Sequence, residues 1–103
     1  MLDQKTVMNN VRRYIKEVTA VMSPAAIVLF GSYAKGSAHE DSDIDVAVIF
    51  NDFQGDWLKT SAELWGLTRK VSTYIEPILL DNADDPSGFV EEVYKTGQIL
   101  YSA

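Results

Sequence analysis

Residues 26–50 read AIVLFGSYAKGSAHEDSDIDVAVIF, two apolar runs separated by a polar segment. The first run, Ala26–Phe30, is short, has no polar position and is rich in residues that favour strands, as in a strand buried on both faces. Residues 31–36 (GSYAKG) predict a glycine-bounded turn that opens a short helix. A polar loop is expected over residues 37–42, before a second strand over Ile44–Phe50. This stretch therefore predicts two buried strands joined by a turn, a short helix and a loop.

Two aspartates, Asp43 and Asp45, stand at the start of the second strand. Because side chains alternate along a strand, both carboxylates point to one face while Ile44 points to the other. Neighbouring carboxylates repel each other, and a hard divalent cation with oxygen ligands is the natural neutralising partner. An isolated Asp-x-Asp is more often a solvated strand start, so the pair alone does not assign a metal site.

The turn after the first strand has the properties of a phosphate-binding segment. A strand that runs into Gly31-Ser32 and then into a helix start presents free backbone N–H groups. Gly31 lets the backbone approach a phosphate closely, Ser32 can donate its hydroxyl, and Lys35 adds a positive charge. Glycine and serine also form ordinary turns, so this segment alone is weak evidence.

Together the turn and the aspartate pair are much more specific. A phosphate cradle and a paired-carboxylate cation site are the two halves of a magnesium–triphosphate site. Five residues fixed at one spacing have a chance probability on the order of one in a million per starting position, at roughly 6% per residue. These residues are Gly31, Ser32, Gly36, Asp43 and Asp45.

Two other motifs are excluded by single residues. A Walker-type P-loop requires lysine after its second glycine, where this chain has Ser37. Asp41, Asp43 and Asp45 begin like an EF-hand loop, but Val46 occupies the position that requires glycine.

The segments GSYAKG (31–36) and SDID (42–45) resemble the nucleotidyltransferase superfamily of DNA polymerase beta. Within it, the chain is similar to the minimal nucleotidyltransferases, the MntA-like antitoxins that pair with HEPN toxins. The resemblance extends over essentially the whole chain, although only the motif segments are diagnostic. It implies an α/β (α+β) nucleotidyltransferase fold, a small mixed β-sheet with helices packed on it, formed by residues 1–103 as a single domain.

The resemblance also implies roles for individual residues. Asp43 and Asp45 are expected to be catalytic and to hold two Mg²⁺ ions, with ATP as substrate. A third catalytic and metal-binding carboxylate is expected on a neighbouring strand, and Glu76 in Tyr74-Ile75-Glu76 is the best match. Family members more often have aspartate there, and the alternative is a surface glutamate on an edge strand. Nucleotide binding is expected from four residues: Gly31, Ser32, Lys35 and Ser42.

Lys35 departs from the pattern of many relatives, which have arginine at this position. The lysine would replace a bidentate phosphate contact with a point charge.

The expected activity is that of a Mg²⁺-dependent protein adenylyltransferase and antitoxin. It would transfer AMP from ATP to a hydroxyl, a tyrosine of a partner HEPN toxin. Larger relatives hold the acceptor in a separate helical domain, for which 103 residues leave no room. One alternative is a non-catalytic antitoxin that masks its partner sterically. Another is a nucleotidyltransferase for small molecules of the aminoglycoside type, or for RNA 3′ ends.

Composition narrows the setting and the partners. The net charge is −6, without the basic stripe of proteins that hold extended nucleic acid. The absence of cysteine excludes disulfides, thiolate zinc sites and cysteine nucleophiles, and one histidine excludes a histidine-rich metal cage. No apolar run approaches the roughly 20 residues that span a bilayer, and no signal peptide is recognisable. A cytoplasmic protein is therefore expected, with an oligomer possible.

The flanking segments complete an expected order αβαβαβαβ. Residues 3–22 predict an amphipathic helix with Asp3 as N-cap and Pro24 ending it. A helix is expected over residues 56–70, and seven of its residues are expected to share a face: Trp57, Leu58, Ser61, Ala62, Leu64, Trp65 and Thr68. Residues 71–80 predict a third strand, which Pro77 confines to an edge or an end.

The C-terminal part predicts a helix and a last strand. Asp85 is expected as N-cap with Pro86 at the first helical position, and Gly97 ends that helix. Residues 98–101 predict a short strand. His39, Trp57 and Trp65 are of types that can contact a nucleotide. An exposed loop position is the expectation for His39, and a core or interface position is the expectation for the two tryptophans.

Overall fold

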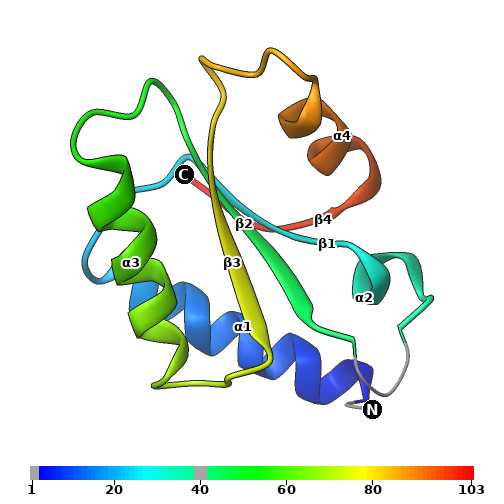
Figure 1. Ribbon diagram of the computed structural model, residues 1–103. Helices are drawn as coiled ribbons and strands as arrows, with labels where there is room; N and C mark the ends of the chain where they lie inside the picture. The colour runs from blue at the N-terminus through cyan, green and yellow to red at the C-terminus, as the bar shows by residue number, and fades with distance from the viewer. Residues whose placement is uncertain (1–2, 39–41) are drawn as a thin grey trace.

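The computed structural model describes residues 3–38 and 42–103, in which helices and strands alternate around one sheet (Figure 1). The elements are α1 (Gln4–Thr19), β1 (Ala26–Phe30), α2 (Ser32–Lys35), β2 (Ile44–Phe50), α3 (Trp57–Thr68), β3 (Ile75–Asp81), α4 (Phe89–Thr96) and β4 (Gln98–Ser102). The expected order of elements is confirmed.

The four strands form a mixed sheet in the order β3-β2-β1-β4. β1 pairs antiparallel with both β2 and β4, whereas β2 pairs parallel with β3. The predicted mixed sheet with helices packed on it is therefore confirmed. β3 lies at an edge, as Pro77 required, because a residue without an N–H is tolerated best where one side of the strand is unpaired.

Helices cover the two faces of the sheet unequally. α1 and α3 pack on one face and enclose the main core, in which Tyr14 donates a 2.7 Å hydrogen bond from its hydroxyl to the Leu64 carbonyl. Burial raises the pKa of the Tyr14 hydroxyl. On the other face, α4 buries Val90 and Val93 against β1 and β2 and leaves the β3 side open (Figure 1).

Three element boundaries differ from the sequence prediction by three or more residues, because local turns compete with the periodic pattern. α1 ends at Thr19 rather than at residue 22, since the N–H groups of Val21 and Met22 both turn back to the Val18 carbonyl. β3 begins at Ile75 rather than at residue 71. Residues 71 and 72 still belong to the turn after α3, donating to the Thr68 carbonyl.

The start of α4 was also predicted wrongly. The helix begins at Phe89, with Gly88 at φ 75° as its N-cap, so Asp85 and Pro86 lie before it in a turn. The Asp85 carboxylate nevertheless accepts hydrogen bonds from the N–H groups of Val90 and Glu91. Asp85 therefore caps the first N–H groups of α4 although it lies outside the helix. Gly97 ends α4, as predicted.

The predicted apolar face of α3 is only partly buried. Leu64 and Thr68 are buried, while Trp57, Leu58 and Trp65 are exposed. Of the core and interface positions that the sequence left open for Trp57 and Trp65, the core is therefore excluded. In the described residues, 3–38 and 42–103, no helix combines the length and apolarity needed to cross a bilayer.

Candidate active site

The two halves of the sequence motif meet where β1 ends. Gly31 follows β1 with φ 74° and ψ −152°, a backbone conformation open essentially to glycine alone. Phe30, the residue before it, pairs with Asp45 of β2. A Cβ atom on residue 31 would overlap the Oδ2 atom of Asp45. The glycine thus makes room for the carboxylate and brings the turn against the acidic strand.

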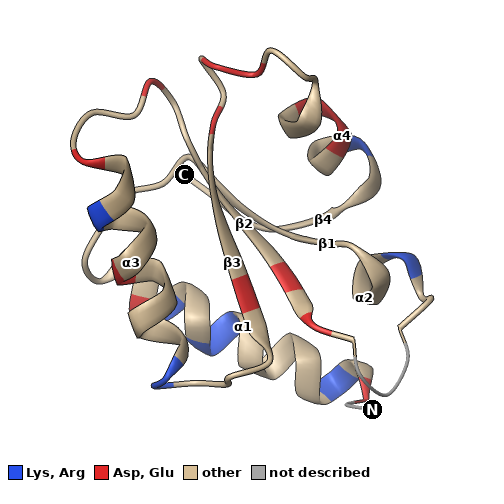
Figure 2. Cartoon of the chain, viewed as in Figure 1, with Lys and Arg blue, Asp and Glu red and all other residues tan. Residues whose placement is uncertain are grey.

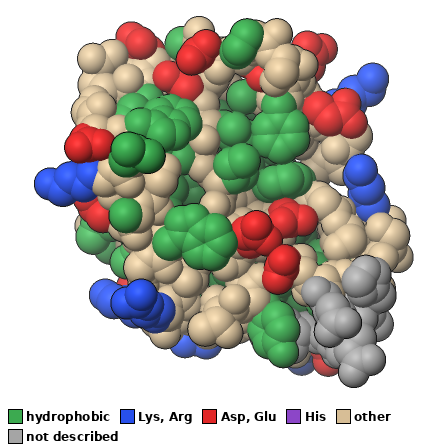
Figure 3. Space-filling view, viewed as in Figure 1, with side chains coloured by type: hydrophobic (Ala, Val, Ile, Leu, Met, Phe, Trp, Pro, Cys, Tyr) green, Lys and Arg blue, Asp and Glu red, His purple; other side chains and the backbone are tan. Residues whose placement is uncertain are grey.

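Three carboxylates gather at this end of the sheet. Asp43 is exposed immediately before β2, Asp45 is half-buried on β2, and Glu76 is exposed on β3. Asp45 and Glu76 are register partners on neighbouring parallel strands, so their side chains leave the same face. Figure 2 shows the acidic segments of the two strands side by side, and in Figure 3 acidic side chains form one patch on this face.

The electrostatics of the cluster follow from this crowding. Hydrogen bonding with the Asp43 carboxylate, followed by burial and by the charges of Asp43 and Asp45, raises the pKa of Glu76. Burial, followed by the charge of Asp43, raises the pKa of Asp45. Both shifts mean that the folded protein resists placing a full negative charge on each group.

The donor set fits a hard divalent cation in its chemistry but not in the arrangement of its side chains. Asp43, Asp45 and Glu76 supply only carboxylate oxygens, the ligands that Mg²⁺ prefers. Within residues 3–38 and 42–103, however, no three histidine, aspartate or glutamate side chains are grouped to hold a metal ion. The carboxylates of Asp43 and Glu76 lie close enough for Asp43 to raise the pKa of Glu76.

Of the residues expected to bind the nucleotide, some adjoin the carboxylates in the fold and others do not. Gly31 and Ser32 adjoin Asp45 at the start of α2. Lys35 is exposed at the other end of that short helix. Ser42 is buried beside Asp43, with 7% of its surface exposed. His39 lies outside the described residues.

Sequence reasoning missed the apolar surroundings of the cluster. Tyr74 is half-exposed, and its carbonyl accepts a 2.8 Å hydrogen bond from the N–H of Ile44, next to Asp43. The alternation within the expected strand over residues 71–80 was the available signal, since it predicts Tyr74 and Ile78 on the face of Glu76. In the structure Ile78 lies on β3 and Tyr74 lies in the turn just before it. Tyr33, the residue after Ser32, packs in the main core.

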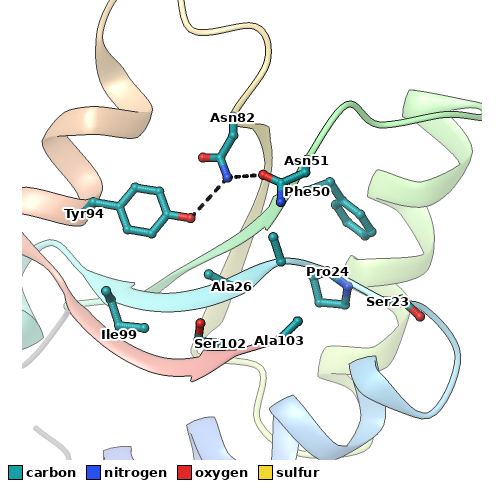
Figure 4. A pocket seen from close by; sticks show the side chains of 11 residues that line it. Ser23, Pro24, Ala26, Phe50, Asn51, Asn82, Tyr94, Ile99, Ser102 and Ala103 are labelled. Carbon is teal, nitrogen blue, oxygen red and sulfur yellow. Dashed lines mark hydrogen bonds between the residues drawn. The ribbon is translucent and has the colours of Figure 1, made fainter.

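A separate hollow of about 460 Å³ lies at the opposite end of the sheet (Figure 4). There Asn82 donates from Nδ2 to Asn51 Oδ1 at 2.6 Å and to the Tyr94 hydroxyl at 3.5 Å. Among the described residues that line this hollow, none belongs to the predicted site. The acidic end of the sheet therefore remains the candidate active site.

Several solved structures share this fold. A crystal structure from Sulfolobus solfataricus, of a protein thought to be a nucleotidyltransferase, has a TM-score of 0.70 and 20% identity over 96% of this chain and 83% of that one. A toxin–antitoxin complex of MntA and HpeT, in mutant form, gives 0.60 and 24% over 100% of this chain and 75% of that one. A toxin–antitoxin structure with AMP-PNP gives 0.55 and 23% over 99% and 75%. At such identities the likeness establishes the fold.

Sequence comparison identifies the family. No curated protein sequence matches this chain significantly. The sequence profile described as "Polymerase beta, Nucleotidyltransferase" matches residues 9–103, which include the Gly31 turn, the Asp43–Asp45 segment and Glu76. Because this match spans nearly the whole chain and the fold agrees with it, the chain belongs to the polymerase beta family and is a nucleotidyltransferase.

Proposed function

We propose that this nucleotidyltransferase transfers AMP from ATP to a tyrosine hydroxyl of a HEPN-type toxin and thereby acts as its antitoxin. The observation that carries the proposal is the meeting of the Gly31 turn with Asp43, Asp45 and Glu76 at one end of the sheet. The structural neighbours add the partner class, because two of them are toxin–antitoxin complexes, one with AMP-PNP and one named MntA–HpeT.

The triphosphate would lie against the start of α2. Gly31 has no side chain there, so the backbone N–H groups that follow β1 can approach phosphate oxygens closely. The Ser32 hydroxyl would donate to a second oxygen, and Ser42 would border the nucleotide beside Asp43. Lys35, exposed at the end of α2, would contribute a positive charge from further away.

The three carboxylates would hold Mg²⁺ and handle the proton of the acceptor. When bound, two Mg²⁺ ions would neutralise phosphate charge and lower the pKa of the acceptor hydroxyl. Glu76 lies on the open side of the cluster and would accept that proton. The freed oxygen attacks the α-phosphorus, the bond to the bridging oxygen breaks, and pyrophosphate leaves.

A non-catalytic antitoxin is the second candidate, and one observation favours it. Within residues 3–38 and 42–103, no three carboxylates are grouped to hold a metal ion. A chain with that arrangement would mask the toxin by binding alone.

Labelling of the partner separates the two candidates. The chain is incubated with α-³²P-ATP, Mg²⁺ and the toxin encoded by the adjacent gene, beside the Asp43→Asn and Asp45→Asn variants. The expected result is label on a toxin tyrosine, located by mass spectrometry and lost in both variants. Asp84→Asn, an exposed aspartate in the loop before α4, is the matched control and should label normally. Equal neutralisation by wild type and variants without label would support masking.

A further inference from the structure

Large apolar side chains are exposed around the carboxylate cluster. On α3 the exposed fractions are 80% for Leu58 and 48% for Trp65, and near β3 they are 49% for Tyr74 and 37% for Ile78. Figure 3 shows hydrophobic side chains bordering the acidic patch on this face. Contiguous exposed apolar surface of this kind usually marks an interaction site, and tryptophan and tyrosine are enriched in such sites.

The exposed apolar side chains of α3 lie on one stripe of that helix. Leu58 and Trp65 are seven residues apart, two helical turns, so they lie on one stripe with the exposed Ala62 between them. Leu64 and Thr68 occupy the buried side of the same helix. α3 packs against Ile75 and Leu79 on the other face of β3, so its exposed stripe approaches Glu76 and Ile78 around the free edge of β3. We call the surface of Leu58, Ala62, Trp65, Tyr74 and Ile78 the acceptor face.

The acceptor face and the Gly31 turn lie on opposite sides of the carboxylates. In the strand order β3-β2-β1-β4, Gly31 and α2 follow β1, whereas α3 lies next to β3. Asp45 on β2 stands between them. A nucleotide held at Gly31 would therefore leave the β3 side free for whatever carries the hydroxyl.

Charge and backbone chemistry argue against a second copy of this chain on the acceptor face. A symmetric pair would bring two clusters of Asp43, Asp45 and Glu76 together, and like charges repel. Pairing of two β3 edges is hindered by Pro77, which has no N–H to donate in the middle of the strand. A different protein with basic side chains around an apolar patch would complement both the negative charge and the apolar surface of this region.

We propose that the acceptor face docks the acceptor protein, with its apolar patch on Trp65 and Leu58 and its basic side chains beside the carboxylates. This docking brings the hydroxyl-bearing side chain to Glu76 from the β3 side. The proposal rests on the proposed function, in that the docked protein is the one to be modified. It assigns to Trp65 and Leu58 the role of selecting the acceptor rather than the nucleotide.

The test uses the full chain and the toxin encoded by the adjacent gene, with Leu58→Ser and Trp65→Ser as variants. Both side chains are exposed, so the fold should persist, which circular dichroism and the Tm confirm. Val21→Ser is the matched control, because Val21 is 61% exposed in the turn after α1, outside the acceptor face. Calorimetry gives the Kd for the toxin, and initial rates of labelling give KM for the toxin and for ATP.

The expected result is a Kd and a toxin KM at least about tenfold higher for Trp65→Ser, with the KM for ATP unchanged and Val21→Ser like wild type. Wild-type Kd in both α3 variants overturns the docking proposal while leaving labelling, and thus the proposed function, intact. If the wild type does not label the toxin but Trp65→Ser binds the toxin more weakly than the wild type, docking is supported and the proposed transfer activity is contradicted. Light scattering gives the oligomeric state of the wild type and of Trp65→Ser. If the wild type is a dimer and the variant a monomer, the face serves self-association and the proposal is overturned.

Discussion

The Asp45 carboxylate occupies the space that a side chain on Gly31 would fill. This relationship explains why a glycine is needed fourteen positions before the second aspartate of the motif. Gly31 combines a backbone conformation that other residues avoid with contact against a carboxylate of the candidate site. Its role is therefore spatial as well as conformational, and the two contributions can be separated by substitution.

Gly31→Ala is expected to reduce nucleotidyl transfer by at least about 100-fold, because the added methyl group must displace Asp45. Backbone strain should lower stability by about 1–3 kcal/mol. Gly36→Ala provides the comparison, since Gly36 also has a positive φ, 73°, but a Cβ there meets nothing within 4 Å. Urea denaturation and labelling rates should show stability loss in both variants and the large activity loss only at residue 31. An equal loss of activity in Gly31→Ala and Gly36→Ala would show that the contact between residue 31 and Asp45 does not matter for transfer.

Glu76→Gln tests the third carboxylate. Proton transfer by a positioned carboxylate typically contributes about 10²–10⁴-fold to a rate, so transfer should fall by at least about 100-fold. The pKa of Glu76 is raised in the folded protein, so its ionisation opposes folding as the pH rises through the usual glutamate range. The variant should therefore have an equal or higher Tm at pH 7. Near-normal transfer rates would remove Glu76 from the catalytic set.

The predictable parts of this protein are those fixed by local pattern. β1, β2 and the turn between them follow from unbroken apolar runs and from glycines that the backbone requires, so Ile44–Phe50 agrees in both bounds. The fold class follows from the same runs and from the family resemblance. The approach of Glu76 to Asp45 depends on parallel pairing between strands far apart in the sequence, which the residues alone do not specify.

The errors have a common physical origin in side-chain and turn interactions. The start of α4 was placed too early because Asp85 bonds to N–H groups five and six residues ahead, a geometry that resembles capping in the sequence. For the exposed tryptophans of α3 the sequence leaves core and interface open, because a periodic pattern identifies a face without stating what covers it. That face became interpretable only once its position beside the carboxylates was known.

Asp81 at the end of β3 gives a prediction on pH dependence. Hydrogen bonds from the backbone N–H groups of Ala83, Phe53 and Asp52 lower the pKa of its carboxyl. A lowered folded pKa contributes stability that is complete above the unfolded pKa and is lost as pH falls through the folded value. The Tm difference between wild type and Asp81→Asn should therefore be constant near neutral pH and shrink below about pH 4. A difference that does not change with pH would contradict this account.

Gly97, between α4 and β4, is expected to tolerate no side chain. A Cβ there would lie 2.6 Å from Val28 Cγ1 and 2.6 Å from the Val93 carbonyl oxygen, and neither the strand nor the helix end can yield without loss of packing. Gly97→Ala should lower the free energy of unfolding by about 1–3 kcal/mol. Gly66→Ala in α3 is the matched control, because its Cβ meets nothing within 4 Å and alanine suits a helix interior better by roughly 0.5–1 kcal/mol. Urea denaturation should move the two midpoints in opposite directions. A shift of both to lower urea would show that α3 requires Gly66 for another reason, whereas an unchanged midpoint for Gly97→Ala would show that α4 can move away from β1.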